Sequence, residues 1–415
     1  MRGTLLPLLI ALAAGAHAEV KITGAYPTDR DGNRVAPVLG EPFFLTVTLA
    51  VSKETKPYRV TVDAPSGVLA ASDLRFGLGA PGAYWTRLGE VAPLFDGPMD
   101  VIVTCSAAKK PLKLRIVPAS PAGAVETYRP QRLSGAYGAS VLFDRAASRL
   151  LAWTPIPESG GFQNVAEKAS EDARTGETAQ PVALTETRGV DRIDVRAECV
   201  TAASSVRTNL ALLRRVPMAA ISSDRTWRGP EARIESTHPE IVKFVAATTK
   251  GMGANAPVAD VALALYGAVL KRSSYATTGA LPDALSALRS GKGECGDLSA
   301  LFVASCRAAG IPARPVSGFA VGTNAWHVWA EFQIPGIGWI PVDPAYALGR
   351  RAHSTTPLYF GVVPELRDRV ALVYGFTQTV GTESTTFLQT PAAFAFDAAS
   401  KLRSASFWCR LQASL

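Results

Sequence analysis

Gly291-Lys-Gly-Glu-Cys-Gly-Asp-Leu-Ser299 begins the stretch of sequence that decides the fold, and this stretch ends at Gly349. Its glycines surround Cys295 with small residues, which suit a tight turn and a close approach of the backbone. The residues that follow have helical spacing up to Gly310 and Pro312, which are helix stop signals. We therefore expect Cys295 at or just before the start of a helix, where unpaired amides and the helix dipole favour a thiolate over a thiol.

A histidine and an aspartate follow on a predicted hairpin. His327 leads an alternating, strand-like segment, and a Pro-Gly turn at 335–338 connects it to a second strand at 339–342 that Asp343 ends. In an antiparallel hairpin the start of the first strand lies beside the end of the second, so His327 and Asp343 are expected to be neighbours. A cysteine, a histidine and an aspartate are what a thiol nucleophile, its base and the group that orients the base require.

The same stretch resembles the transglutaminase-like core, a branch of the papain-like thiol fold, over residues 237–349. The matching motifs are Gly-x-Cys-Gly-Asp, the run from Cys306 to Phe319, His-x-Trp-x-Glu and Gly-Trp-Ile-Pro-Val-Asp-Pro, in the family's order. One departure is Val328, where the family often has alanine. The resemblance implies that Cys295 is the nucleophile, His327 the base and Asp343 the residue that orients the base.

Two tryptophans beside His327 are candidate substrate-binding residues. Trp326 and Trp329 could wall an acyl tunnel or exclude water, and packing in the core explains them equally well. Glu331, on the same strand, is expected to be solvated or paired rather than catalytic. Cys306 lies on the apolar run without a partner motif and is expected to be a buried, small apolar residue.

The N-terminus reads as a secretory signal peptide. Met1-Arg2 gives a positive start, Leu5 to Ala16 form an apolar run too short to span a bilayer, and Ala-x-Ala ends at Ala18. No later apolar run reaches the length of about 18 residues that a membrane span needs. We therefore expect an exported protein, periplasmic or secreted, without stable membrane insertion.

The five cysteines and the charge limit the other possibilities. In an oxidising compartment an odd number of cysteines suggests one free thiol. If this is Cys295, then Cys105, Cys199, Cys306 and Cys409 allow three pairings, or all four stay reduced. No metal-ligand spacing is present, so neither a metal nor another cofactor is expected. The net charge of +8 comes without a basic cluster interleaved with aromatics, which argues against nucleic acid. The resemblance to the transglutaminase-like core implies a protein or peptide as the substrate.

Composition and patterning predict an α+β protein of several parts. After the signal peptide at 1–18 we expect an immunoglobulin-like β-sandwich at 19–121, a second β-rich region at 122–235, the transglutaminase-like catalytic core at 236–350 and a C-terminal β extension of the core at 351–415. A single continuous N-terminal β domain is the alternative for the first two regions. Strands are expected at 43–49, 58–62, 100–104, 112–117, 139–143, 150–153, 192–197, 358–361 and 369–375, with a long polar loop at 157–180. Helices are expected to begin near Thr237, Asn255 and Leu281.

Together these features predict an exported thiol acyl-transfer enzyme of transglutaminase-like type. The Cys295 thiolate would form a thioester with a carboxamide or peptide carbonyl, and an amine (crosslinking) or water (hydrolysis) would resolve it. The alternatives are a cysteine peptidase or amidase that acts on envelope peptides, and a non-catalytic envelope-binding protein on the same fold.

Overall fold

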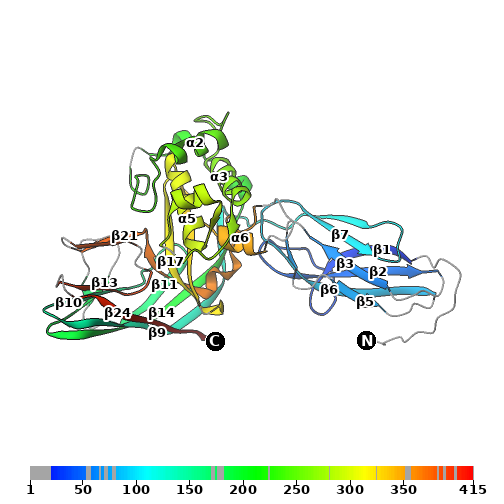
Figure 1. Cartoon of the computed structure of the whole chain (residues 1–415). Helices are drawn as coiled ribbons and strands as arrows, with labels where there is room; N and C mark the ends of the chain where they lie inside the picture. The colour runs from blue at the N-terminus through cyan, green and yellow to red at the C-terminus, as the bar shows by residue number, and fades with distance from the viewer. Residues whose placement is uncertain are drawn as a thin grey trace. The chain divides into compact units, whose positions relative to one another are not determined.

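The computed structural model describes residues 20–52, 58–64, 67–69, 73–76, 81–169, 173–174, 182–222, 225–279, 281–323, 325–350, 357–380, 383–386, 389–396 and 400–414. The expected signal peptide at 1–18 lies outside these residues. The chain divides into two compact units, residues 1–121 with 350–358, and residues 122–349 with 359–415 (Figure 1). Helices and strands both contribute, which agrees with the expected mixed fold class.

The first unit contains two four-stranded antiparallel sheets, ordered β1-β2-β6-β4 and β5-β3-β7-β8. The strands are β1 (Val20–Thr28), β2 (Phe43–Val51), β3 (Tyr58–Asp63), β4 (Gly67–Leu69), β5 (Asp73–Phe76), β6 (Gly82–Pro93), β7 (Met99–Cys105) and β8 (Leu112–Ile116). Apolar side chains of both sheets, such as Val47, Leu49, Val60 and Val101, form one buried core. The strands expected at 43–49, 58–62, 100–104 and 112–117 are confirmed, and the immunoglobulin-like assignment stays a prediction.

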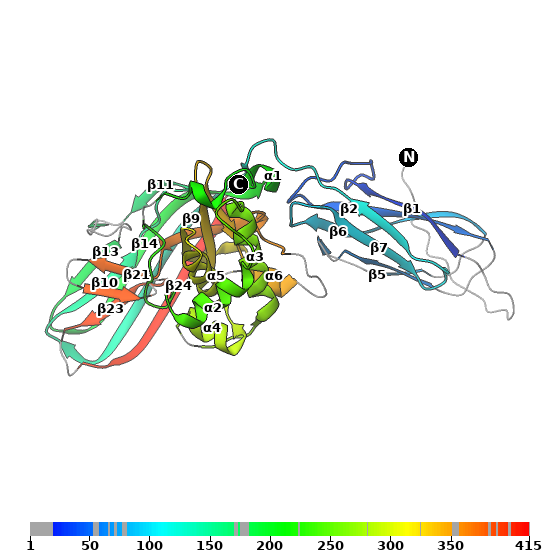
Figure 2. The same ribbon diagram turned by 90° about the horizontal axis from the view of Figure 1, so that it is seen from above.

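The β-rich part of the second unit is built around two long strands, β9 (Val125–Ala147) and β14 (Val190–Thr208), which include the strands expected at 139–143 and 192–197. They belong to a sheet ordered β11-β14-β9-β24, and a second sheet is ordered β12-β13-β10-β23. The other strands are β10 (Leu150–Pro155), β11 (Gln163–Ala169), β12 (Ala173–Arg174), β13 (Val182–Thr187), β23 (Ala392–Ala395) and β24 (Leu402–Ser414). Strands β23 and β24, near the C-terminus, thus pair with β10 and β9, respectively (Figure 2).

The transglutaminase-like part consists of helices next to a four-stranded antiparallel sheet ordered β19-β18-β17-β20. Its helices are α2 (Pro239–Thr248), α3 (Val258–Arg272), α4 (Ala284–Ser290), α5 (Cys295–Ala308) and α6 (Pro344–Arg350), and its strands are β17 (Ala313–Ala320), β18 (Ala325–Ile334), β19 (Gly338–Val342) and β20 (Arg369–Tyr374). Short elements complete it: α1 (Leu210–Leu213), η1 (Met218–Ala220), β15 (Ser274–Tyr275), β16 (Lys292–Gly293), η2 (Val321–Thr323), η3 (Pro364–Asp368), β21 (Thr377–Val380) and β22 (Glu383–Thr386). Helix α5 packs on β18, where Phe302 meets Phe332 edge-on with ring centroids 6.2 Å apart.

Two sequence-based expectations are wrong. The loop expected at 157–180 contains β11 and β12, because β11 is an edge strand whose polar side chains can face water while its backbone pairs with β14. The strand expected at 358–361 makes only an isolated bridge between Val342 and Phe360. The left-handed backbone of Tyr359 (φ 61°) and Gly361 (φ 70°) interrupts the extended path there.

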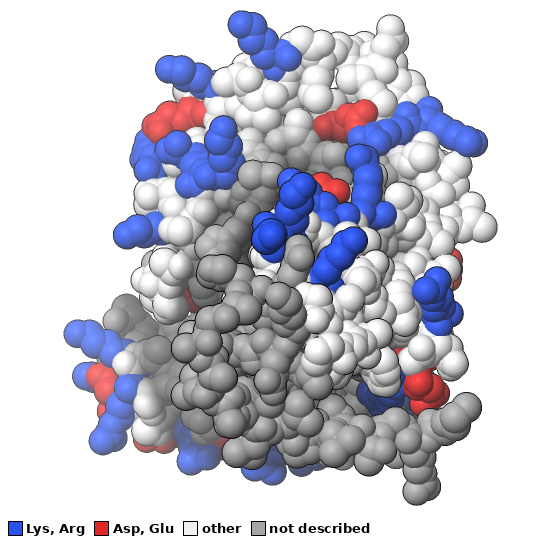
Figure 3. Space-filling view, turned by 90° about the vertical axis from the view of Figure 1, so that its right-hand side faces the viewer, with Lys and Arg blue, Asp and Glu red and all other residues white. Residues whose placement is uncertain are grey.

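Figure 3 shows how the charged side chains lie on one face of the protein. On the face shown in Figure 3, the described Lys and Arg side chains are spread over the surface with Asp and Glu side chains among them. No helix within the described ranges combines the length and the apolar character that a membrane crossing needs.

Candidate active site

The first turn of α5 positions Cys295, which is the first residue of this helix and is partly exposed. The carboxylate of Asp297 accepts the backbone N–H of Glu294 at 3.0 Å and that of Asp283 at 3.0 Å, and Asp297 is buried. The Glu294 carboxylate in turn accepts the backbone N–H groups of Thr278 and Gly279 at 2.8 and 2.9 Å. The start of α5 is therefore tied to the preceding loop and to the start of α4, so that the position of Cys295 is fixed from several sides.

The glycines around Cys295 are required for two different reasons. Gly291 has a φ of 66° and ends α4 in the left-handed conformation that glycine adopts without strain. At Gly296 a Cβ atom would lie 2.5 Å from Cγ of Pro282, and at Gly293 it would lie 2.6 Å from Cβ of Asp297. The close approach inferred from the sequence is thus real, and it is made by side chains that pack against the helix start.

The β18–β19 hairpin brings His327 and Asp343 together. Its register pairs Ala330 with Val342, so Asp343, directly after β19, lies near the beginning of β18. Nε2 of His327 lies 2.7 Å from Oδ2 of Asp343. The Cys295 side chain lies close enough to His327 to help raise the pKa of the imidazole. The three residues singled out in the sequence are therefore brought together in one site.

Charges in this site favour a protonated histidine next to an ionised aspartate. Burial has the largest effect on His327 and lowers its pKa, and the charge of Arg369 lowers it further, but the charge of Asp343 together with side-chain interactions with Asp343 and Cys295 raises the net pKa above 6.5. Burial raises the pKa of Asp343, yet the charges of His327 and Arg369 and its hydrogen bonds bring it down to about 2. At neutral pH the aspartate is therefore a fixed negative charge that stabilises an imidazolium.

Arg369, the first residue of β20, completes the site, and sequence reasoning did not find it. Its Nη2 lies 2.8 Å from Oδ2 of Asp343, and the two side chains are 1% and 0% exposed. The guanidinium carbon lies 5.3 Å from the ring centroid of Trp329 and 4.7 Å from that of Tyr346. The only signal in the sequence is an arginine at the start of an apolar strand, where a buried charge needs a partner.

Two tyrosines near the three residues were also missed. The backbone N–H of Tyr346 donates to Oδ1 of Asp343 at 2.9 Å, and its ring packs edge-on against His327 with centroids 5.0 Å apart. Tyr275 is 52% exposed and lies on β15, which pairs in parallel with β16 just before Cys295. Burial and then the charges of Cys295, Glu294 and Asp343 raise the pKa of Tyr275, which places its phenol within electrostatic reach of the site.

The two tryptophans proposed for substrate binding differ in position. Trp329 is 2% exposed and stacks on His327, with ring centroids 6.3 Å apart and an angle of 18° between the planes. Trp326 is half-buried and meets Phe319 edge-on, with centroids 5.3 Å apart. Trp329 therefore supports the histidine from within the core, and Trp326 packs beside the apolar cluster that includes Phe319. Glu331 is buried and paired with Arg314 at 2.8 Å.

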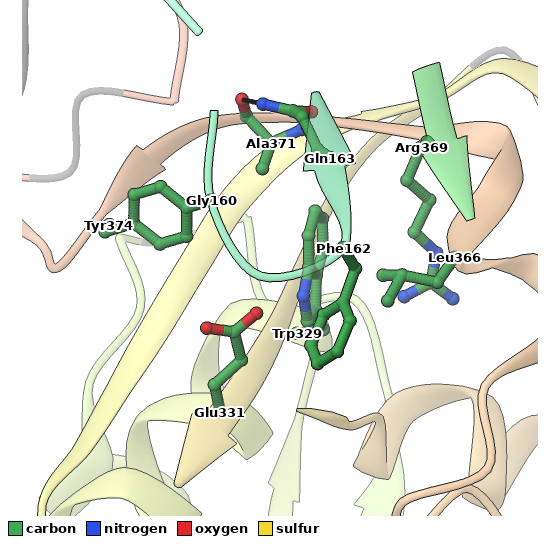
Figure 4. Close-up of a pocket in the computed structure, with 10 residues that line it drawn as sticks. Gly160, Phe162, Gln163, Trp329, Glu331, Leu366, Arg369, Ala371 and Tyr374 are labelled. Carbon is green, nitrogen blue, oxygen red and sulfur yellow. Dashed lines mark hydrogen bonds between the residues drawn. The ribbon is translucent and has the colours of Figure 1, made fainter. Parts of the chain in front are cut away.

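A small cavity lies beside Arg369 on the inner side of the site (Figure 4). Its lining includes Gln163, Trp329, Glu331, Arg369 and Tyr374, and its volume is about 10 Å³. The amide of Gln163 closes it by bonding both backbone groups of Ala371, at 3.0 and 2.9 Å (Figure 4). This volume holds about one water molecule, so the cavity is too small for a peptide side chain.

The other four cysteines differ from Cys295 in their surroundings. All five thiols are free. Burial raises the pKa of Cys105, raises that of Cys199 to about 12 and that of Cys409 to about 11, and raises that of Cys306 well above its usual range. These four thiols are therefore weak nucleophiles at neutral pH, whereas Cys295 is partly exposed and lies beside a histidine. The described residues contain no group of three or more His, Cys, Asp or Glu side chains that could hold a metal ion.

Comparison with known proteins identifies the part of the chain that carries this site. Residues 245–344 match the Transglutaminase-like superfamily, so the chain contains a transglutaminase-like domain, and the resemblance seen in the sequence is confirmed. Cys295, His327 and Asp343 all lie within the matched residues.

One solved structure supports the same fold. A putative cysteine protease from Cytophaga hutchinsonii superposes with a TM-score of 0.50 at 13% identity, over 70% of this chain and 92% of that one. A putative protease from Parabacteroides distasonis covers 79% of this chain and 67% of that one at 12% identity, with a TM-score of only 0.23. An uncharacterized protein from Haemophilus influenzae is 36% identical over 78 residues, 13% of this chain and 21% of that protein. The chain thus spans about a fifth of the length of this curated relative.

Proposed function

We propose that the protein is an exported thiol acyl-transfer enzyme of transglutaminase-like type. The observation that carries the proposal is that Cys295, His327 and Asp343 meet in one site, with His327 hydrogen-bonded to Asp343 and the thiol at the start of a helix and partly open to solvent. The match to the Transglutaminase-like superfamily covers all three residues and supports it. Export is supported by the N-terminal sequence, which has the form of a cleavable signal peptide.

The first half of the reaction forms a thioester. The Cys295 thiolate attacks the carbonyl carbon of a carboxamide, and the carbonyl electrons move onto oxygen. We expect backbone amides in the first turn of α5 to stabilise this oxyanion. When the tetrahedral intermediate collapses, His327 gives its proton to the leaving nitrogen, and ammonia (or an amine, from a peptide bond) departs. Asp343 keeps the imidazole ring in the orientation that both transfers need.

The second half returns the enzyme to its starting state. A primary amine attacks the thioester carbonyl, His327 accepts its proton, and the sulfur leaves as a thiolate, so that an isopeptide bond is formed. Water follows the same path and yields a carboxylic acid. Hydrolysis is the second candidate, because the superposing structure from Cytophaga hutchinsonii is described as a cysteine protease. Access of amine or water to the thioester decides between the two outcomes.

Incubation of the protein with a glutamine-containing peptide and a labelled primary amine tests the proposal, with mass spectrometry of the peptide as the readout. Incorporation of the amine indicates acyl transfer, conversion of glutamine to glutamate indicates deamidation, and cleavage indicates a peptidase. Cys295→Ala should abolish all three, and Cys409→Ser, which changes the other partly exposed thiol, should retain them. Activity that persists in Cys295→Ala would refute the assignment of the nucleophile.

Alkylation of the thiol separates an enzyme from a non-catalytic binding protein. A thiolate paired with an imidazolium reacts with iodoacetamide well below pH 8.5, the usual pKa of a free cysteine, whereas an ordinary thiol does not. We expect fast alkylation near pH 6 in the wild-type chain that is lost in Cys295→Ala and slowed in His327→Asn. A rate that rises only above about pH 8 would favour the binding protein.

A further inference from the structure

We propose that Arg369 is a positioning residue of this site, which holds the Asp343 carboxylate in place and offsets part of its negative charge so that His327 can both accept and release a proton. This role rests on the proposed function. The contacts between Arg369 and Asp343 are seen in the structure whatever the reaction is. Arg369 reaches Oδ2 of Asp343 at 2.8 Å, the same oxygen that lies 2.7 Å from Nε2 of His327.

The surroundings of the guanidinium indicate that Arg369 is placed to pair with Asp343 rather than to fill space in the core. Buried arginines normally satisfy their N–H groups, because an unpaired buried donor is costly. Here Nε, Nη1 and Nη2 all lack a hydrogen bond among the described residues, and Nη2 instead lies at ion-pair distance from Asp343, the one close anionic contact of the side chain within them. The rings of Trp329 and Tyr346 contact the guanidinium and help to fix it. The same two rings contact His327, so one aromatic pair supports both cations.

The effect on His327 follows from the sign of the charges. The groups that act on the imidazole are Asp343 and Cys295, which favour its protonated form, and Arg369, which disfavours the protonated form. Tyr346 adds only an aromatic edge, and Glu365, on η3, acts on Arg369. Without Arg369, a fully uncompensated carboxylate would hold the proton on His327 too firmly for efficient transfer to the leaving nitrogen.

The test is a titration of His327 in the full-length protein, followed by NMR of ¹³C-labelled histidine and assigned with His327→Asn. The chain has four histidines, so the signals are few. In Arg369→Gln we expect the midpoint of His327 to rise by about half a pH unit or more, because a neutral side chain no longer opposes Asp343. Arg367→Gln, which changes a partly exposed, ion-paired neighbour on η3, is the control and should leave the midpoint unchanged.

A second variant keeps the proposal testable if Arg369→Gln does not fold. Arg369→Lys retains a cation, but its ammonium is not planar and cannot pack against the rings of Trp329 and Tyr346 as the guanidinium does. We expect a smaller rise of the His327 midpoint, together with a lower kcat and a nearly unchanged KM in the amine-incorporation assay. A midpoint at or below the wild-type value in either folded variant would overturn the proposal. Because the titration needs no substrate, this result stands whether or not the protein proves to transfer acyl groups.

Discussion

At the residue scale, Asp343 interacts with two cations through one carboxylate oxygen. Its side chain is fully buried between His327 and Arg369, and its second oxygen accepts the backbone N–H of Tyr346. Two buried positive groups close together would repel each other strongly without the negative charge between them. The carboxylate therefore contributes to the stability of the core as well as to the orientation of the histidine.

Replacing Asp343 by asparagine should reveal both contributions. The change leaves Arg369 as an uncompensated buried charge, so we expect a loss of roughly 3–5 kcal/mol in the free energy of unfolding at pH 7 and a fall in activity of about 100-fold or more. Urea unfolding followed by tryptophan fluorescence measures the first effect, and the amine-incorporation assay the second. Asp368→Asn changes a partly exposed carboxylate nearby and should alter neither.

The loss of stability in this variant should depend on pH in a defined direction. The pKa of Asp343 is lowered from 3.8 to about 2, so its stabilising contribution is present above the pKa of the unfolded chain and disappears as the pH falls through the folded value. The difference in unfolding free energy between wild type and Asp343→Asn should therefore shrink between about pH 4 and pH 2. An equal difference at pH 7 and pH 2.5 would contradict this account of the carboxylate.

Asp343 could be predicted as a site residue from the sequence, whereas Arg369 could not. Asp343 could be linked to His327 because one short hairpin fixes their separation. Arg369 reaches the same carboxylate through β20, which pairs with β17 across more than 40 residues of chain. No local sequence pattern predicts that β20 pairs with β17. Arg369 could therefore be predicted as a strand residue, but not as a neighbour of Asp343.

At the element scale, the start of α5 depends on how closely other segments can approach it. A Cβ at position 296 would lie 2.5 Å from Cγ of Pro282, whose ring cannot move aside as a flexible side chain can. We expect Gly296→Ala to displace the helix start, to cost about 1–3 kcal/mol in unfolding free energy and to slow alkylation of Cys295 at pH 6.

A second glycine-to-alanine change is the matched control for this prediction. Gly267 lies inside α3, where an added Cβ would meet nothing within 4 Å. Gly267→Ala should therefore leave alkylation unchanged and stabilise the helix by up to about 1 kcal/mol. If Gly296→Ala alkylated at the wild-type rate, the packing against Pro282 would not be what positions the thiol.

Elements were predicted best where their own residues carry the pattern. The helices near Thr237, Asn255 and Leu281 were found through caps, proline and apolar spacing, and they appear as α2, α3 and α4. The strand β11 was read as a loop because its sequence is polar, and it lies at the edge of its sheet, where pairing with β14 holds its backbone. Leu358 to Gly361 were read as a strand because they are apolar, yet they are buried without a regular ladder.

At the scale of the whole molecule, the β19-β18-β17-β20 sheet shares its core with the β-rich part of the second unit. Phe319 and Leu372, from β17 and β20, belong to the same buried cluster as Leu133 and Tyr137 of β9 and Leu411 of β24. The first unit has a separate cluster that draws on its own two sheets. Stability of the site should therefore depend on β9 and β24, although neither strand contributes a residue to it.

Two truncations test this division of the chain. Removal of residues 1–121 takes away most of the first unit, including its own core, so we expect the fragment 122–415 to fold and to alkylate at Cys295 at nearly the rate of the full chain. Removal of 400–415 deletes β24, exposes the edge of β9 and takes Leu411 out of the shared cluster, so we expect poor folding and loss of fast alkylation.

Six of the seven tryptophans lie in the second unit, so their fluorescence reports its unfolding directly. Fast alkylation that survives the loss of β24 but not the loss of 1–121 would reverse the inference, because the thiol site would then depend on the first unit rather than on the core it shares with β9.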